Sequence, residues 1–212
     1  MINSIKLAQA LNEKLCHDFA GSIGAIDNCT DLIESIDDVT RRKAADIIRI
    51  SAQTLINYLK FYRYLYSEAP LDSQVNFAEI CNITHGFVEL KNSTIKFEII
   101  PSKSCTISAT IAQLIMGFVS LAVDDLTHDG VIKLNLFFDN GFFNIKTIVQ
   151  SSKLKFHQQK FDNLTNKNHI NNLSTHYSHE YYIYCLTKNL GYKIEVVQSN
   201  NKIEYNCIYA KN

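Results

Sequence analysis

The feature that most constrains the fold of this chain is a long amphipathic helical pattern at its start. Apolar residues recur there at steps of three and four, the spacing that places side chains on one face of an α-helix. The residues in this stripe are Leu7, Leu11, Leu15, Phe19, Ile23, Ile26 and Ile33. The spacing predicts one helix from about residue 3 to residue 35.

The same pattern returns after a short polar break. The break contains Ser35, Asp37, Asp38 and Thr40. The second stripe consists of Ala44, Ile47, Ile48, Ala52, Leu55, Leu59, Tyr62 and Leu65. Two long helices with a short connection pack antiparallel, but a single hairpin has too few faces to bury both stripes. A second copy would complete a four-helix bundle, so we expect a homodimer.

The pattern changes after residues 67–75, where Pro70 interrupts the helical period. The elements predicted beyond this linker are helices around 77–88, 109–126 and 176–189, a strand at 95–99, a hairpin of 131–138 and 142–149 around Asn140-Gly141, and a closing hairpin of 192–197 and 202–210. Residues 151–174 are rich in Asn, Lys, Gln and Ser and predict a loop with one helical turn. The sequence therefore predicts an α+β protein, with a helical hairpin at 1–68 and an α/β sandwich at 76–212.

Charge, hydropathy and cysteine spacing exclude several classes of function. Twenty-one basic residues balance 21 acidic ones, so the positive excess typical of nucleic-acid binding is missing. The longest apolar stretch, at 111–123, is well short of the roughly 20 residues that a membrane span needs. The six cysteines form no C-x-x-C pair, and the first 20 residues carry charges that a secretion signal would not tolerate. We expect a cytoplasmic protein that binds neither nucleic acid nor membrane.

The most informative segment runs from Leu15 to Ile26 and contains a His-Asp pair, His17 and Asp18. At 100° per residue His17 lies roughly 200° from the apolar stripe, so its imidazole is expected to be exposed. The residues predicted to surround it are Glu13, Lys14, Ala20, Gly21, Gly24 and Asn28, together with Ala10. Glycine inside a helix costs about 1 kcal/mol relative to alanine, so two of them need a reason. Small residues around an imidazole let another protein bring its backbone close.

Histidine suits group transfer because a neutral ring nitrogen is available as a nucleophile near neutral pH. Asp18 is expected either to hold the ring in one tautomer or to accept a proton. A plain surface histidine is the competing interpretation, and the His-Asp pair alone favours it. The complete segment, placed on a helical hairpin, favours the nucleophile.

Ordered motifs along the chain carry a resemblance to a known family. They are Leu15-Cys16-His17-Asp18, Gly24-Ala25-Ile26-Asp27-Asn28, Leu59-Lys60-Phe61-Tyr62-Arg63, Ala122-Val123-Asp124-Asp125-Leu126 with Gly130, and Tyr181-Tyr182 through Leu190-Gly191. The chain resembles the bacterial Chp-type histidine phosphotransferases, which keep the dimerisation hairpin and a degenerate ATPase-like domain of a sensor histidine kinase without its ATP-binding machinery. One departure is Ser22, which stands where such segments commonly carry proline.

The resemblance implies a phosphorelay protein in which His17 carries the phosphoryl group and Asp18 assists. Donors would be receiver domains of hybrid histidine kinases, and acceptors would be response regulators. A docked receiver would contact the face around His17. The expected position of Lys14 and Arg63 near the open end of the hairpin, and not the resemblance, is the reason to expect that they help to hold an acidic receiver. The chain itself would bind no cofactor or metal, and Mg²⁺ would come from the acidic pocket of the receiver.

An active kinase needs an Asn-bearing helix for Mg²⁺, an Asp-x-Gly-x-Gly turn and a glycine-rich lid over the phosphates. The expected helix has no Asn between Leu114 and Ala122, and the whole chain has seven glycines. We therefore predict no ATP binding and no autophosphorylation. Two alternatives stay open: a non-catalytic dimer that binds and sequesters receivers, and a sensor kinase with an unorthodox nucleotide site.

The remaining candidate groups favour structural interpretations. The cluster of Asp124, Asp125, His128 and Asp129 is more typical of a capped, solvated turn than of a metal site. His176 and His179 lie one turn apart without a third ligand and are predicted to be surface residues. Cys16 cannot activate His17, because adjacent helix residues point about 100° apart. The tyrosines predicted to form the core and rim of the bundle are Tyr58, Tyr62, Tyr64 and Tyr66.

Overall fold

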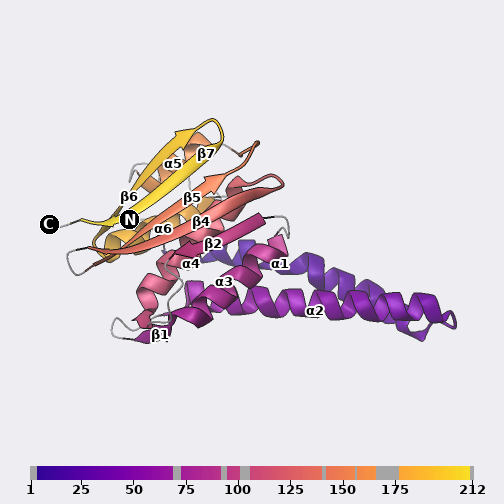
Figure 1. Ribbon diagram of the computed structural model, residues 1–212. Helices are drawn as coiled ribbons and strands as arrows, with labels where there is room; N and C mark the ends of the chain where they lie inside the picture. Colours follow the sequence, from indigo (N-terminus) through magenta and orange to yellow (C-terminus); the bar gives the residue numbers. More distant parts are fainter. Residues whose placement is uncertain are drawn as a thin grey trace.

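A long helical hairpin projects from a domain built on a mixed sheet (Figure 1). The computed structural model describes residues 4–68, 73–91, 95–100, 106–139, 142–155, 157–165 and 177–210, with backbone only for 4, 95–100 and 139. The hairpin consists of α1 (Ser4–Thr30), a 3₁₀ turn (Asp31–Glu34) and α2 (Asp38–Tyr66). The two predicted helices are confirmed, and the last turn of the first is a 3₁₀ turn.

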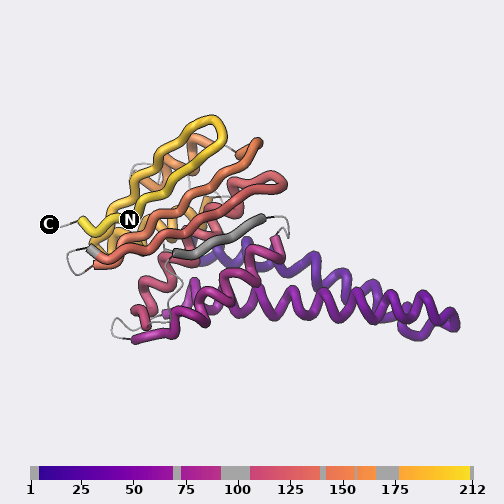
Figure 2. The backbone as a smooth tube through the Cα atoms, in the orientation of Figure 1, coloured from indigo at the N-terminus to yellow at the C-terminus, as the bar shows by residue number. Residues whose placement is uncertain are grey.

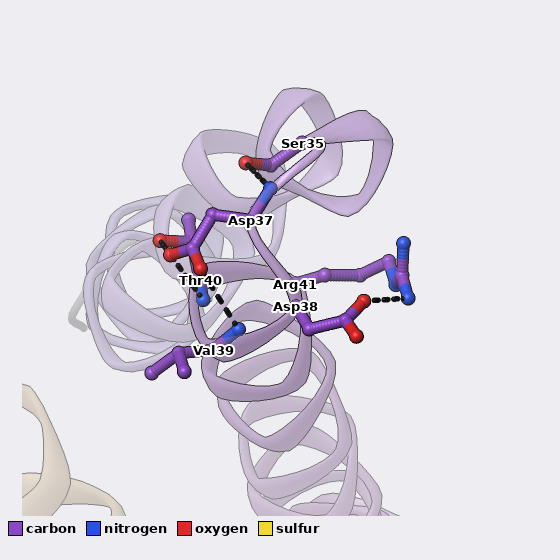
Figure 3. Close-up of polar contacts among 6 residues, drawn as sticks. All are labelled: Ser35, Asp37, Asp38, Val39, Thr40 and Arg41. Atoms are coloured by element: carbon purple, nitrogen blue, oxygen red, sulfur yellow. Dashed lines mark hydrogen bonds and ion pairs between the residues drawn. The ribbon is translucent and has the colours of Figure 1, made fainter.

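The tip of the hairpin is fixed by a polar cap, drawn in Figure 3. The carboxylate of Asp37 accepts hydrogen bonds from the backbone N–H of Val39 at 3.3 Å and of Thr40 at 3.1 Å. Ser35 Oγ accepts from the N–H of Asp37 at 3.2 Å. A side-chain cap of this kind stabilises a helix by about 1 kcal/mol, because it satisfies N–H groups that the helix leaves unbonded. The polar break in the sequence therefore contains the N-cap of α2, Asp37, while Asp38 and Thr40 lie in the first turn of the helix.

In the part of the chain that the structure describes, the sheet of the α/β domain has five strands in the order β2-β4-β5-β7-β6. Its members are β2 (Ile95–Ile100), β4 (Gly130–Asp139), β5 (Phe142–Gln150), β6 (Tyr192–Ser199) and β7 (Lys202–Tyr209). β2 pairs with β4 in parallel, and the other pairs are antiparallel. Both predicted hairpins are confirmed, although Asn140 and Gly141 lie outside the described residues. The short antiparallel pair β1 (Gln74–Asn76) and β3 (Thr106–Ser108) was not predicted, because three residues are too few to show a period.

Among the described residues, four helices complete the domain. They are α3 (Phe77–Lys91), α4 (Ala109–Asp125), α5 (Gln158–Thr165) and α6 (Ser178–Asn189). α4 is the centre of the packing, since it contacts α2, α3 and α6 as well as the sheet, and is buried from Thr110 to Val123. Phe61 and Leu65, near the end of α2, are fully buried in the same core. The base of the hairpin is therefore part of the core of the α/β domain.

The far half of the hairpin extends beyond the α/β domain (Figure 2). Large apolar side chains lie exposed along it and further down the two helices: Ile23, Leu32, Ile33, Ile36, Val39, Ile47, Ile50, Ile56 and Leu59. These positions include members of the two stripes that the sequence predicts to be buried in a bundle. In the described parts of the chain, no helix has the length and hydropathy needed to cross a bilayer.

Two polar residues that were predicted to be at the surface are buried. Asp125 is 1% exposed and accepts hydrogen bonds from Lys160 Nζ and from the Tyr205 hydroxyl, each at 2.5 Å. The prediction of a solvated turn is wrong for Asp125 because Lys160, on a helix that packs against α6 and β6, reaches the end of α4 and bonds to the carboxylate. α5 also has eight residues, more than the single turn predicted for 151–174; residues 166–176 lie outside the described chain.

His179 is the second of these residues, at 2% exposed. Its Nδ1 lies 3.0 Å from the hydroxyl of Tyr66 on α2. The prediction of a surface histidine is wrong because α6 packs against the base of the hairpin, an arrangement that the local spacing cannot show. Burial lowers the pKa of His179 to about 3, so the ring is neutral. His176 lies outside the described residues.

Candidate functional site

His17 lies on the outer face of α1, and its side chain is 89% exposed. Leu15 and Phe19, which flank it in sequence, pack against the core of the domain. Successive residues of a helix are rotated by about 100°, so His17 points away from the face on which Leu15 and Phe19 pack, and its imidazole faces solvent. The exposed position predicted from the helical projection is confirmed.

Asp18 is held between three helices, with its side chain 10% exposed. Its Oδ1 lies 3.7 Å from Nδ1 of His17. Its other oxygen, Oδ2, accepts a hydrogen bond from the hydroxyl of Tyr62 on α2 and lies 3.5 Å from Nζ of Lys91 on α3. The carboxylate is thus anchored through one oxygen and presents the other to the imidazole.

The charges around Asp18 keep it ionised. Burial alone would raise the pKa of its carboxyl, but the cations of Lys14 and Lys91 and the hydroxyl of Tyr62 bring the pKa below its usual value. Burial raises the pKa of Tyr62, and the negative charge of Asp18 raises it further, so Tyr62 stays a protonated donor. For Lys91, burial alone would lower the pKa, but Asp18 and its other neighbours raise it overall. The group is therefore a carboxylate flanked by cations and a phenol.

A column of aromatic rings lies beneath this group. Tyr62 stacks between Tyr58 and Tyr66, with ring centroids 6.0 and 5.7 Å away and planes within 9° of parallel. Phe87 of α3 meets Tyr58 and Tyr62 edge-on, at 6.1 Å from each. The tyrosines had been predicted to line the dimer bundle. Tyr58 and Tyr62 are indeed buried, but at the junction of the hairpin with α3, because three-dimensional packing brings α3 to that face.

The residues predicted to meet a partner lie around His17 with differing exposure. Exposed members are Glu13, Ala20, Gly21, Asn28 and Arg63, and half-exposed ones are Lys14 and Gly24. A Cβ added at Gly21 or Gly24 would meet no atom within 4 Å in the described chain. Packing within this chain therefore does not require either glycine. Arg63 follows Tyr62, which bonds to Asp18, so it lies at the same level of the hairpin as His17.

Sequence reasoning missed Lys91. It belongs to none of the motifs and is far from Asp18 in the chain. The only local indication is that a lysine in the last turn of a helix is favourable, which says nothing of its partner. Among the described residues, no group of three or more His, Cys, Asp or Glu side chains is placed to hold a metal ion.

The sequence matches no family model and no curated protein. Its structure is similar to one described as a bacterial phosphotransferase, with a TM-score of 0.79 over 98% of each chain at 18% identity. The chain has a histidine-kinase-like fold. The histidine kinase domain of the blue-light activated kinase EL346 from Erythrobacter litoralis is similar at a TM-score of 0.50 and 12% identity, over 92% of this chain and 94% of that one. The resemblance indicated by the sequence motifs is confirmed in the fold.

Proposed function

We propose that this protein is a histidine phosphotransferase of a phosphorelay. His17 takes a phosphoryl group from the aspartyl phosphate of one receiver domain and delivers it to the aspartate of another. The observation that carries the proposal is the setting of His17: an imidazole 89% exposed, with Nδ1 facing an anchored carboxylate at 3.7 Å. This leaves Nε2, on the far side of the ring, open to an incoming phosphoryl group.

The chemistry balances without any additional reagent. With a proton on Nδ1, the lone pair of Nε2 attacks the phosphorus, and the bond from phosphorus to the donor aspartate breaks with release of its carboxylate. The phosphorylated ring keeps its Nδ1 proton and gains positive charge, which the Asp18 carboxylate stabilises. In the second half, the acceptor aspartate attacks the phosphorus, and the P–N bond returns its electrons to Nε2.

The partner surface follows from the same face of α1. Its small residues, Ala20, Gly21 and Gly24, allow close approach of a receiver, and Glu13 and Asn28 offer polar contacts, with Lys14 at the edge. Arg63, on α2, adds a further polar contact. Phosphoryl transfer depends on in-line positioning and neutralised charge. We assign the Mg²⁺ that neutralises the phosphoryl group to the acidic pocket of the receiver, so this chain needs no cofactor of its own.

We also propose that the chain does not bind ATP. The glycine-rich motifs are missing from the sequence. The helix that would carry the Mg²⁺-binding Asn is α4. Lys160 of α5 lies against the last turn of α4, where it donates to the carbonyl of Leu121 at 2.8 Å and to Asp125. A buried lysine of the chain itself therefore binds the end of this helix.

The exposed apolar side chains of the hairpin support a homodimer. Residues 1–68 would be the dimerisation and phosphotransfer domain, and residues 76–212 the ATPase-like domain. Two copies would bury their apolar stripes in a four-helix bundle, because large contiguous apolar surfaces are rare on monomers. We place this dimer in the cytoplasm, where hybrid kinases and response regulators operate.

The test is transfer from a receiver domain carrying labelled aspartyl phosphate to the purified protein. Wild type, His17→Gln and His157→Gln are compared, the last being a control at another exposed histidine. Acid-labile label is expected on wild type and on His157→Gln, and none on His17→Gln. Receiver binding without any label would instead favour the sequestering protein, and label from ATP alone would favour a kinase.

A further inference from the structure

We propose that Lys91 is a positioning residue for His17, supplied by the α/β domain and acting through Asp18. The effect on transfer rests on the proposed function, but the effect on the ring of His17 can be measured without any transfer. The proposal rests on residues from three helices that meet at Asp18. They are His17 and Asp18 on α1, Tyr62 on α2 and Lys91 on α3.

The two anchors of Asp18 meet at the same atom. Tyr62 donates to Oδ2, and Nζ of Lys91 lies 3.5 Å from Oδ2. A carboxylate held at one oxygen by a single donor can still rotate about that contact, whereas two donors from different helices fix its plane. With Oδ2 occupied from both sides, Oδ1 is left for Nδ1 of His17, 3.7 Å away. Lys91 therefore helps to fix the orientation in which the carboxylate faces the imidazole.

Lys91 is itself held in place. Its ammonium lies 4.9 Å from the ring centroid of Tyr58 and 5.6 Å from that of Phe87, and its side chain is 22% exposed. Cations attract ring faces, and the C-terminal end of a helix favours positive charge. The lysine is thus a fixed point of the α/β domain, and not a freely moving surface charge.

Lys91 also balances charge beside the imidazole. Lys14 on α1 and Asp124 on α4 contribute to the same field, but among the described residues Lys91 is the only lysine within ion-pair distance of Asp18. Without it, the Asp18 carboxylate keeps one hydrogen-bonded anchor and can rotate away from Nδ1 of His17. The imidazole is then expected to sample both tautomers and several orientations.

The experiment records the nitrogen-15 NMR spectrum of the His17 imidazole in the full-length, unphosphorylated protein. Wild type is compared with Lys91→Met, Lys91→Arg and a control, Lys188→Met. Lys188 is a matched control because it also lies in the last turn of a helix, with its ammonium over a tyrosine ring, at 5.9 Å from the centroid of Tyr184. We expect wild type, Lys188→Met and Lys91→Arg to show mainly the Nδ1–H tautomer, and Lys91→Met to show a mixture.

Transfer kinetics give the second readout. Lys91→Met is expected to lower kcat for transfer about tenfold, the scale of a small misplacement of reacting groups, with KM for the receiver unchanged. In an Asp18→Asn background the same substitution is expected to have no further effect, because Lys91 acts through the carboxylate.

Two results would overturn the proposal. One is a folded Lys91→Met protein whose His17 spectrum is that of wild type; the other is a full further loss of kcat when Lys91→Met is added to Asp18→Asn. If Lys91→Met does not fold, Lys91→Gln and Lys91→Arg decide the matter by the same spectrum. If wild type accepts no phosphoryl group, the proposed function fails, while the tautomer of His17 still tests the part played by Lys91.

Discussion

Two carboxylates in this molecule bind the same kinds of partner, a lysine and a tyrosine, but one is enclosed in the core and the other lies beside an exposed histidine. Asp18 meets Lys91 and the hydroxyl of Tyr62, and Asp125 meets Lys160 and the hydroxyl of Tyr205. At Asp125 the lysine binds one oxygen and the tyrosine the other, so both oxygens are used inside the protein. At Asp18 both partners meet Oδ2, and Oδ1 faces an exposed histidine.

The balance between burial and neighbouring charges separates the two groups. Burial is the largest influence on both carboxyls: it raises the pKa of Asp125 despite Lys160, whereas at Asp18 the cations and a phenol outweigh it and bring the pKa below its usual value. A carboxylate bound by a lysine and a tyrosine can therefore either stabilise a buried core or present its negative charge to a reactive group. The first occurs when both carboxylate oxygens are bound inside the protein, and the second when one oxygen is left to face the reactive group.

The largest predicted effect concerns Asp125 and its buried partner Lys160. Lys160→Met leaves the buried carboxylate of Asp125 without its cation, and breaking a buried pair in this way costs about 3–5 kcal/mol. The free energy of unfolding, from urea titration, should fall by that amount, while transfer by the folded protein at low temperature should stay near that of wild type. A loss below about 1 kcal/mol would show that Lys160 contributes little to the core.

Glu180, also in this buried region, gives a prediction about pH. Burial raises its pKa from 4.5 to about 7 in the folded protein. The folded state then holds a proton that the unfolded state has lost between these values, so this group lowers stability as pH rises from 4.5 to about 7. Glu180→Gln should remove this loss, with a gain over wild type on the order of 3 kcal/mol at pH 8 and almost none at pH 4.

Unfolding titrations of wild type and Glu180→Gln at both pH values measure that difference. A gain of equal size at pH 4 and pH 8 would mean that the substitution acts through packing and not through the charge of Glu180.

For Asp18 and its partners Lys91 and Tyr62 we predict a smaller effect on stability. Asp18→Asn removes the charge that Lys91 and Tyr62 meet, at a cost of about 1–2 kcal/mol at neutral pH. Since the folded pKa of Asp18 is lowered, its contribution is complete above the ordinary value of 3.8 and is lost as pH falls through the lower folded value. The difference between wild type and variant should thus be constant from pH 5 to pH 8 and disappear in strong acid. A difference that disappears already near pH 5 would contradict the lowered pKa.

The smallest effect belongs to the face around His17. Gly21→Ala should raise the free energy of unfolding by about 0.5–1 kcal/mol, because alanine favours helix and its Cβ meets nothing within 4 Å in the described chain. The same substitution should weaken receiver binding, which titration calorimetry measures. Stabilisation together with unchanged binding would remove Gly21 from the partner surface.

Local spacing explains why the hairpin and the exposure of His17 were predictable. Leu15 and Phe19 define the inward face of α1, and the position of the imidazole follows from helix geometry alone. The cap at Asp37 is likewise local, since its partners are two and three residues away. Features of this kind depend on a few consecutive residues and need no knowledge of the rest of the fold.

The partners of both carboxylates are tertiary and could not be predicted. Lys160 lies in a polar segment whose composition indicates solvent, yet it is buried because Asp125 and a backbone carbonyl receive its ammonium. His179 is buried because α6 packs against Tyr66 of the hairpin. Composition reports the average preference of a residue, and a single ion pair or hydrogen bond between distant helices reverses it.

The central claim is that Asp18 holds Nδ1 of His17 so that Nε2 receives the phosphoryl group. The most direct test is phosphorus-31 NMR of the wild-type protein after transfer from a phosphorylated receiver, with His17→Gln as the reference. The account predicts one phosphohistidine, bonded through Nε2, that is missing from His17→Gln. A phosphoryl group on Nδ1, or on a residue other than His17, would contradict it.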